Sequence, residues 1–270
     1  MNDLDNNYTD NSFNLYQAYS YTLLLQLEAS SFGYAVVHQN RLLVSAQNCD
    51  LNELAHPIQL SELLTATYKK VIIGLPALAL TLVPKSLFSV DHAGEFARFL
   101  DVKETEKVFA QTLDDQNMIV YKTDGELVEA IERFGLQNTV YTAQGWIKAI
   151  EKSNPPDTCL FLELGKNTVQ FLYFSSGSLR FYNTFEFRSE DELAYFTSFV
   201  ADELKLKPMQ TTLVLSGDIA IGDKCMRRLA DFYPRIELNW LKILDLPGQL
   251  PAHKLLALAA LSLCGSSEAV

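Results

Sequence analysis

The chain has 270 residues, of which 48% are hydrophobic and 20% are charged, and its formal net charge is −11. This balance is typical of a packed globular protein and excludes a chain that is disordered throughout. The excess of acidic groups repels phosphate backbones and anionic lipid headgroups. We therefore expect neither a nucleic-acid partner nor binding to bare anionic membranes.

The cysteines and the apolar stretches predict a compartment. The four cysteines are far apart in the sequence and have no histidine at metal-ligand spacing, which predicts free thiols rather than disulfides or a metal site. The first residues lack the basic start and apolar run of a signal peptide. The apolar stretches are too short to span a bilayer. The sequence therefore predicts a cytoplasmic protein with no membrane span.

The first half begins with a polar segment and continues as alternating elements. Residues 1–20 are rich in Asn, Asp, Tyr and Ser and predict a loose N-terminal arm. Three closely spaced apolar runs follow, at 21–29, 33–39 and 40–47, and predict an antiparallel meander. The later pattern predicts a partly helical stretch at 51–68, strands at 69–76, 79–84, 116–124 and 138–142, and helices at 89–102, 125–135 and 143–153.

The segment 154–157, Asn-Pro-Pro-Asp, interrupts this pattern and is the best linker candidate. We therefore expect two domains, residues 1–153 and 154–270.

The second half repeats the order of the first, with strands predicted at 159–187. Leu179, Phe181, Phe185 and Phe187 recur at a period near two and predict one buried face of a strand. Ser189 and Glu192 have the spacing of a capping box that begins a helix. Its buried positions are predicted at Leu193, Phe196, Phe199, Val200 and Leu204. Strands at 211–218 and 236–243 and helices at 224–233 and 252–265 complete the half.

The two halves align when Glu28 is placed on Glu163, an offset of 135 residues, the difference between 163 and 28. In this alignment "LQLEASSFGYAVV" lies over "LFLELGKNTVQFL". Both segments predict a strand, an acid, a small polar turn and a second strand, and the later elements agree in order. We therefore predict an internal duplication.

The turns of the two halves contain the candidate site residues. A phosphate binds to backbone N–H groups in a turn without obstructing Cβ atoms, and Mg²⁺ prefers carboxylate oxygens. Two interpretations stand: these residues are remnants of a nucleotide site, or they are ordinary polar residues at strand ends. The candidates are Glu28, Ser30 and Ser31 in the first half, and Glu163, Gly165, Asn167, Thr168, Gly217 and Asp218 in the second.

This order of elements and turns resembles the actin-like ATPase superfamily, which includes actin, sugar kinases, heat-shock chaperones and bacterial division and pilus-assembly proteins. The resemblance covers residues from about 20 onwards. It is greatest to the compact pilus-assembly and division branch, and to an uncharacterised bacterial family with an actin-like ATPase fold. It implies an α/β fold of two ribonuclease-H-like, actin-like lobes with mixed sheets.

In that superfamily each lobe begins with a strand, an Asp-x-Gly turn and a second strand. The resemblance implies that the two turns bind the phosphates of the nucleotide, and that a later Gly-Gly turn contacts adenosine. The last helix resembles the small-residue helix that crosses between the lobes. The corresponding turns here are Glu28-Ala29-Ser30, Glu163-Leu164-Gly165 and Ser216-Gly217-Asp218.

These turns depart from the family pattern. Both acids are Glu rather than Asp, Ser30 stands where the family has glycine, and the later turn has one glycine instead of two. An extra methylene displaces a carboxylate from a site that tolerates little misplacement. We therefore expect no catalytic residue, no metal site and no cofactor, with ATP and Mg²⁺ as the ligands to test.

The resulting hypothesis is a non-catalytic, actin-like scaffold or adaptor with a degenerate nucleotide site. The alternative is an ATP-dependent enzyme or nucleotide switch of the same superfamily. A scaffold acts by contact, so we expect a protein partner or self-association. Tyr173, Tyr182 and Tyr195 are predicted on the polar sides of their elements. There they would be contact anchors on the surface of the second hairpin.

Overall fold

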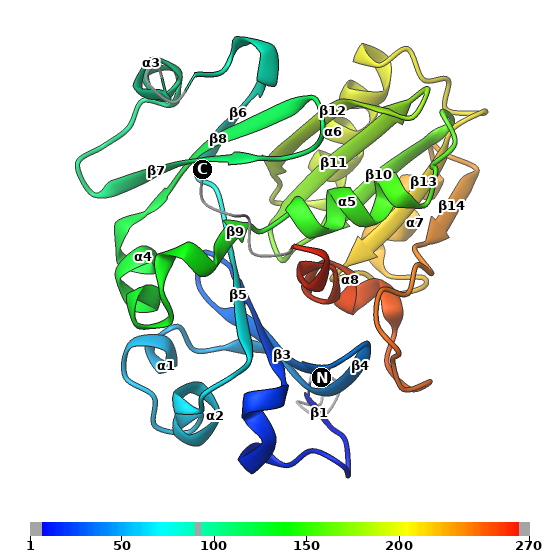
Figure 1. Cartoon of the computed structure of the whole chain (residues 1–270). Helices are drawn as coiled ribbons and strands as arrows, with labels where there is room; N and C mark the ends of the chain where they lie inside the picture. Colours follow the sequence, from blue (N-terminus) through cyan, green and yellow to red (C-terminus); the bar gives the residue numbers. More distant parts are fainter. Residues whose placement is uncertain (1–6, 90–92, 265–270) are drawn as a thin grey trace. The chain divides into compact units, whose positions relative to one another are not determined.

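The computed structural model describes residues 7–89 and 93–264 (Figure 1). The chain divides into two compact units, called here the first unit (Met1–Gly145 with Leu258–Val270) and the second unit (Trp146–Ala257). These divisions fall inside helix α5 (Gln144–Lys152) and helix α8 (Ala252–Ala260). The boundary expected from the sequence, between residues 153 and 154, lies just after α5.

The last described residues belong to the first unit because they pack on its sheet. The 3₁₀ helix η8 (Leu261–Leu263) contacts strands β2 (Thr22–Leu27) and β5 (Lys70–Leu75). A Cβ atom at Gly74 would lie 3.1 Å from Leu261 Cδ2, and one at Gly145 would overlap the carbonyl group of Ala260. Gly145 therefore allows the close approach of the Ala260 backbone, and Gly74 leaves room for the side chain of Leu261.

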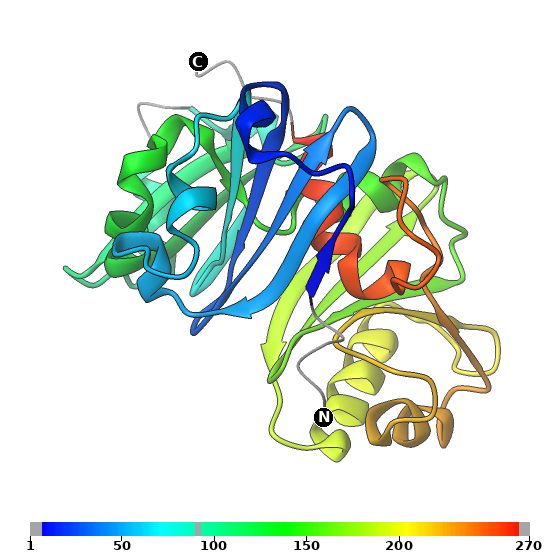
Figure 2. The ribbon, with the colours of Figure 1, turned by 90° about the horizontal axis from the view of Figure 1, so that it is seen from below.

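The first unit contains a six-stranded mixed sheet in the order β1-β4-β3-β2-β5-β9. Strands β2, β3 and β4 form the predicted antiparallel meander, and β5 and β9 are parallel to β2. Helices α1 (Asn52–Ala55), α2 (Ser61–Thr65) and α4 (Gly125–Ile131) lie on one face of this sheet (Figure 2). The remaining bounds are β1 (Asn7–Thr9), β3 (Phe32–His38), β4 (Arg41–Cys49) and β9 (Thr139–Tyr141).

The prediction of a loose arm at residues 1–20 is wrong for residues 7–20, and residues 1–6 lie outside the described residues. Strand β1 pairs with β4, with Tyr8 opposite Ser45, and the 3₁₀ helix η2 spans Leu15–Ser20. Asp10 fixes the segment between them, because its carboxylate accepts hydrogen bonds from the hydroxyl of Tyr8 and from Arg41 Nη2. Polar bonds therefore order this segment, and the bond from Arg41 joins it to a residue that is distant in the sequence.

A separate antiparallel sheet, in the order β6-β8-β7, lies in the chain between β5 and β9. Strand β7 was not predicted, because most of its side chains are exposed or only half-buried. A buried pair holds it, since Lys122 Nζ donates to Glu106 Oε2 and to the Asp101 carbonyl, both at 2.8 Å. The elements are β6 (Ala79–Pro84), η3 (Lys85–Leu87), α3 (Ala93–Ala97), η5 (Arg98–Leu100), β7 (Glu106–Thr112) and β8 (Asn117–Asp124). Two further 3₁₀ helices follow α4, η6 (Glu132–Phe134) and η7 (Leu136–Asn138).

The second unit contains a five-stranded mixed sheet in the order β12-β11-β10-β13-β14. Helices α6 (Glu190–Glu203) and α7 (Lys224–Ala230) lie on one face and α5 lies on the other (Figures 1 and 2). Cover on both faces explains why β10 is almost entirely apolar. The strands are β10 (Cys159–Leu164), β11 (Thr168–Ser175), β12 (Ser178–Glu186), β13 (Thr212–Gly217) and β14 (Arg235–Leu238).

The predicted N-cap of α6 at Ser189 is confirmed, but the side chain of Glu192 bonds the residue before the N-cap instead of the N-cap itself. Ser189 Oγ accepts a hydrogen bond from the N–H of Glu192 at 3.2 Å, and Glu192 Oε2 accepts one from the N–H of Arg188 at 2.7 Å. Of the predicted buried stripe, Leu193 and Val200 are buried, but Phe199 is 47% exposed. Phe199 lies beside Tyr195, 6.3 Å between ring centroids, rather than in the core.

Ser189→Ala is expected to lower the free energy of unfolding by about 1 kcal/mol, because the N–H of Glu192 loses its acceptor. Urea unfolding followed by tryptophan fluorescence measures this, since Trp146 and Trp240 both lie in the second unit. Ser189→Asp is the control and should retain most of the stability, because its carboxylate can accept the same bond. Equal losses in both variants would contradict the capping role.

The strand registers of the two units confirm the duplication but change the offset. Leu27 pairs with Phe32 in the first unit as Leu164 pairs with Val169 in the second. The parallel ladder starts with Thr22 opposite Lys70 in the first unit, and with Cys159 opposite Thr212 in the second. Equivalent positions are therefore 137 residues apart, the difference between 164 and 27, instead of the predicted 135.

Candidate functional site

The first candidate turn follows β2 and is closed by its own side chains. The N–H of Glu28 donates to the carbonyl of Ser31 at 2.9 Å, and Ser31 Oγ donates to Glu28 Oε2 at 3.2 Å. Glu28 and Ser30 are exposed and Ser31 is half-buried. The turn therefore presents a carboxylate at its surface, which repels a phosphate.

The second candidate turn follows β10 and has the same length. The N–H of Gly165 donates to the carbonyl of Thr168 at 2.8 Å. A Cβ atom at Gly165 would lie 2.6 Å from Thr168 Oγ1, so the position favours glycine. Asn167 is exposed, and Glu163 is only 8% exposed, at the last but one position of β10.

The two turns can be compared position by position, because residues 28–31 and 165–168 close the same hydrogen-bonded loop. Glu28 is equivalent to Gly165, and Gln26 is equivalent to Glu163. The predicted match of Glu28 with Glu163 is therefore displaced by two residues. The first unit has the neutral Gln26 where the second has an acid, and an acid where the second has glycine.

The later candidate turn lies directly beside the second one. Gly217 ends β13 opposite Leu164, and the N–H of Asp218 donates to the Leu164 carbonyl at 2.7 Å. Gly217 has a φ of +86°, and a Cβ atom there would overlap the Leu164 carbonyl oxygen. Gly217 is therefore required by the packing of two strand ends, whether or not a ligand binds.

The structure thus gathers the second-half candidates, Glu163, Gly165, Asn167, Thr168, Gly217 and Asp218, at the carboxyl ends of β10 and β13. The three first-half candidates, Glu28, Ser30 and Ser31, share one turn of the first unit.

Three polar residues near these strand ends were not singled out from the sequence. Lys166 follows Gly165, is exposed, and is a cation within the second turn. Asn239 follows β14 and is buried, and its N–H donates to the Leu215 carbonyl. His253 is buried, with Nε2 2.9 Å from the Ile219 carbonyl, and burial lowers its pKa. Of the three, only Lys166 could have been singled out from the sequence, because it stands next to the turn glycine Gly165.

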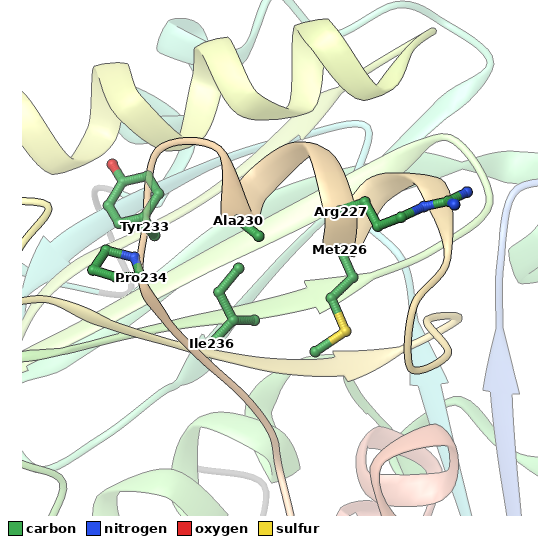
Figure 3. Close-up of a pocket in the computed structure, with 6 residues that line it drawn as sticks. All are labelled: Met226, Arg227, Ala230, Tyr233, Pro234 and Ile236. Carbon is green, nitrogen blue, oxygen red and sulfur yellow. The ribbon is translucent and has the colours of Figure 1, made fainter.

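A shallow pocket of about 350 Å³ lies between α7 and the amino-terminal end of β14 (Figure 3). The side chains of Met226, Ala230 and Ile236 line it, with Tyr233, Pro234 and Arg227. The candidate turns lie at the carboxyl ends of β10 and β13 instead. The pocket is mainly apolar and contains no acid–base pair, so it offers contact area rather than chemistry.

The predicted surface of the second hairpin is wrong for two of its three tyrosines. Tyr182 is 5% exposed and donates its hydroxyl to Gln170 Oε1 at 2.8 Å. Tyr173 is buried in the core that faces α6. Both faces of this sheet are covered, so alternation along the strands does not give a polar side. Tyr195 on α6 is 63% exposed, as predicted.

In the part of the chain that the structure describes, residues 7–89 and 93–264, no group of three or more His, Cys, Asp or Glu side chains is placed to hold a metal ion. None of its helices has the length and apolar character needed to cross a membrane.

A family model described as "Protein of unknown function (DUF3822)" matches residues 10–236. No curated protein matches the chain significantly. A Bacteroides thetaiotaomicron protein with an actin-like ATPase fold and unknown function is similar in structure, with a TM-score of 0.72 and 18% identity. That alignment covers 84% of this chain and 93% of the other.

Two other solved structures extend the similarity over more of the chain. The PilM–PilN type IV pilus biogenesis complex gives a TM-score of 0.62 at 16% identity, over 91% of this chain and 98% of the other. The ethanolamine utilization protein EutJ from Carboxydothermus hydrogenoformans gives 0.50 at 9% identity, over 94% and 92%. Together with the sheet orders, these similarities confirm the actin-like ATPase fold and its mixed α/β class.

Proposed function

The chain belongs to the DUF3822 family, and from the geometry of its two turns we propose that it is a protein-binding, actin-like scaffold with an incomplete nucleotide site. The observation that carries this proposal is the position of the acid in the first unit, which is two residues later than the equivalent acid of the second unit. In the first unit, Gln26-Leu27-Glu28 stands where the second unit has Glu163-Leu164-Gly165.

The first turn is unsuited to a nucleotide phosphate for two physical reasons. Glu28 places a negative charge and a Cβ atom where the second turn has the bare backbone of Gly165. Gln26 is neutral, so it cannot supply the carboxylate oxygen that Mg²⁺ prefers. A phosphate at this turn would meet repulsion without a metal ion to offset it.

The second turn fits an anion better. It retains Gly165, the hydroxyl of Thr168, and the exposed cation Lys166. Glu163 keeps an acid at the end of β10, although with one more methylene than Asp. Half of a phosphate-binding arrangement therefore remains, which supports descent from a nucleotide-binding protein more than present turnover.

A protein partner is the natural ligand of a scaffold. The structurally similar PilM is solved in a complex with PilN, a protein of type IV pilus biogenesis. The surface of the second unit offers contact residues of the favoured type, including Tyr195, Phe199 and Trp240, all exposed. Large aromatic side chains at a surface are common anchors of protein interfaces.

Mg-ATP is expected to leave the melting temperature of the wild-type chain unchanged. A ligand present at 100 times its Kd would add about 2.7 kcal/mol to the free energy of unfolding, which a melting assay resolves. The matched gain-of-function variant combines Gln26→Asp, Glu28→Gly and Glu163→Asp, which restores the family pattern in both turns. This variant is expected to show a Mg-ATP-dependent rise.

The alternative function, an ATP-dependent enzyme or switch, is favoured by the retained second turn. It predicts that the wild-type chain already melts at a higher temperature with Mg-ATP, and that Gly165→Val removes the rise by filling the space beside Thr168 Oγ1. That pair of results would replace the scaffold proposal with the alternative.

A further inference from the structure

The sheet of the second unit has an open edge at β14. Among the described strands, only β13 pairs with β14. The N–H of Asn239 donates to the Leu215 carbonyl, so Asn239, Glu237 and Arg235 direct their backbone groups toward β13. Because successive residues of a strand alternate, Ile236 directs its N–H and C=O away from the sheet. This edge can therefore accept another strand.

The apolar pocket under α7 lies beside this edge. Ile236 is half-buried and shares the pocket with Met226 and Ala230 of α7 (Figure 3). In a sheet, the side chain opposite Ile236 on an added strand lies on the same face as Ile236. An apolar side chain at that position would therefore enter the pocket.

The segment Arg235-Ile236-Glu237 at this edge can pair with the same segment of a second copy in one antiparallel register. When two β14 strands run antiparallel about Ile236, the N–H and C=O of Ile236 pair with those of Ile236 of the second copy. Arg235 then lies opposite Glu237 of the second copy, and Glu237 opposite its Arg235. These two flanking pairs do not exchange backbone hydrogen bonds. Their side chains therefore lie closer together than those of the hydrogen-bonded Ile236 pair. Both residues are exposed in the single chain.

We propose that a second copy of this chain binds at β14, so that the two five-stranded sheets join into one antiparallel continuation. In a parallel pair only one of two opposed residues directs its backbone groups at the partner strand, so a parallel second copy would place Arg235 or Glu237 opposite Ile236. A charged side chain would then lie on the face of the apolar pocket, which is unfavourable. An uncharged apolar ligand would fill the pocket but leave the charges of Arg235 and Glu237 without counterparts. The alternation of cation, isoleucine and acid fits an antiparallel second copy.

The chain also limits the strength of this association. Strand β14 has four residues and follows Pro234, which has no N–H to donate to a longer ladder. We therefore expect a weak dimer that forms as the concentration rises. The inference goes beyond the scaffold role and does not depend on the candidate turns, so the nucleotide assay and the dimer assay can fail separately.

Sedimentation equilibrium over a concentration series is the test. The wild-type chain should form a dimer. Arg235→Glu alone places two acids opposite each other at both flanking pairs, and Glu237→Arg alone places two cations there. Each single variant should raise the dimer Kd about tenfold or more. An equimolar mixture of the two variants should associate again, because every flanking pair is then oppositely charged.

Arg180→Glu is the matched control, because Arg180 is exposed on β12, the other edge strand of the same sheet. It changes the net charge equally and should leave the dimer intact. Hydrogen exchange provides a second readout, since the Ile236 amide should become protected as the concentration rises. A wild-type chain that stays monomeric overturns the proposal. The proposal is also overturned if neither Arg235→Glu nor Glu237→Arg changes the dimer Kd, or if Arg180→Glu raises the Kd as much as they do.

Discussion

Gly217→Ala is expected to lower the free energy of unfolding of the second unit by about 3 kcal/mol or more. The residue has a φ of +86°, which disfavours any side chain, and its Cβ atom would overlap the carbonyl oxygen of Leu164. That carbonyl already accepts the N–H of Asp218, so it has little freedom to move. The ends of β10 and β13 would be forced apart.

Gly222→Ala separates the two causes. Gly222 has a similar φ of +74°, but a Cβ atom there would meet nothing within 4 Å. It should cost only the conformational strain, about 1 kcal/mol. Urea unfolding followed by tryptophan fluorescence measures both variants. If the two losses are equal, the close approach of β10 and β13 is not what requires Gly217.

Phe171→Ala is expected to cost about 3–5 kcal/mol, because it removes a fully buried ring from the core that faces α6. The ring packs edge-on against Phe185 at 5.6 Å between centroids, and Phe185 packs against Phe196 of α6 at 5.0 Å. One substitution therefore loosens a strand, its neighbour and the helix above them.

Tyr195→Ala is the matched control on the outer side of α6. Its ring is 63% exposed, so its loss should change the free energy of unfolding by less than about 0.5 kcal/mol. Urea unfolding with fluorescence detection compares the two variants. A small effect of Phe171→Ala would mean that the core of the second unit is not organised around this aromatic chain.

Much of the fold could be predicted because its strands are apolar runs that turn residues interrupt. Strands β2 to β5 and β10 to β13 follow from such runs, and α6 follows from Ser189 and Glu192. Strands β1 and β7 could not be found in this way. Asp10 and the buried pair of Lys122 and Glu106 hold them, and such bonds join residues that are distant in the sequence.

The candidate site could be predicted in part. The six candidates of the second unit meet because β10 and β13 are parallel neighbours, which the repeated strand order indicates. The predicted alignment of the two units was wrong by two residues because it matched Glu28 to Glu163 by residue type. The hydrogen-bonded strand registers, which residue types alone do not reveal, make Gln26 the equivalent of Glu163. Burial of Tyr182 likewise depends on helices at both faces of the sheet.

The division inside α5 and α8 has a consequence for how the chain is made. The second unit is continuous in sequence, whereas the first unit is interrupted by it. The segment that packs beside Gly74 and Gly145 is synthesised only after the whole second unit. Domains fold as they emerge from the ribosome. The first unit therefore cannot complete its packing until the whole second unit has been synthesised, although most of its residues are made earlier.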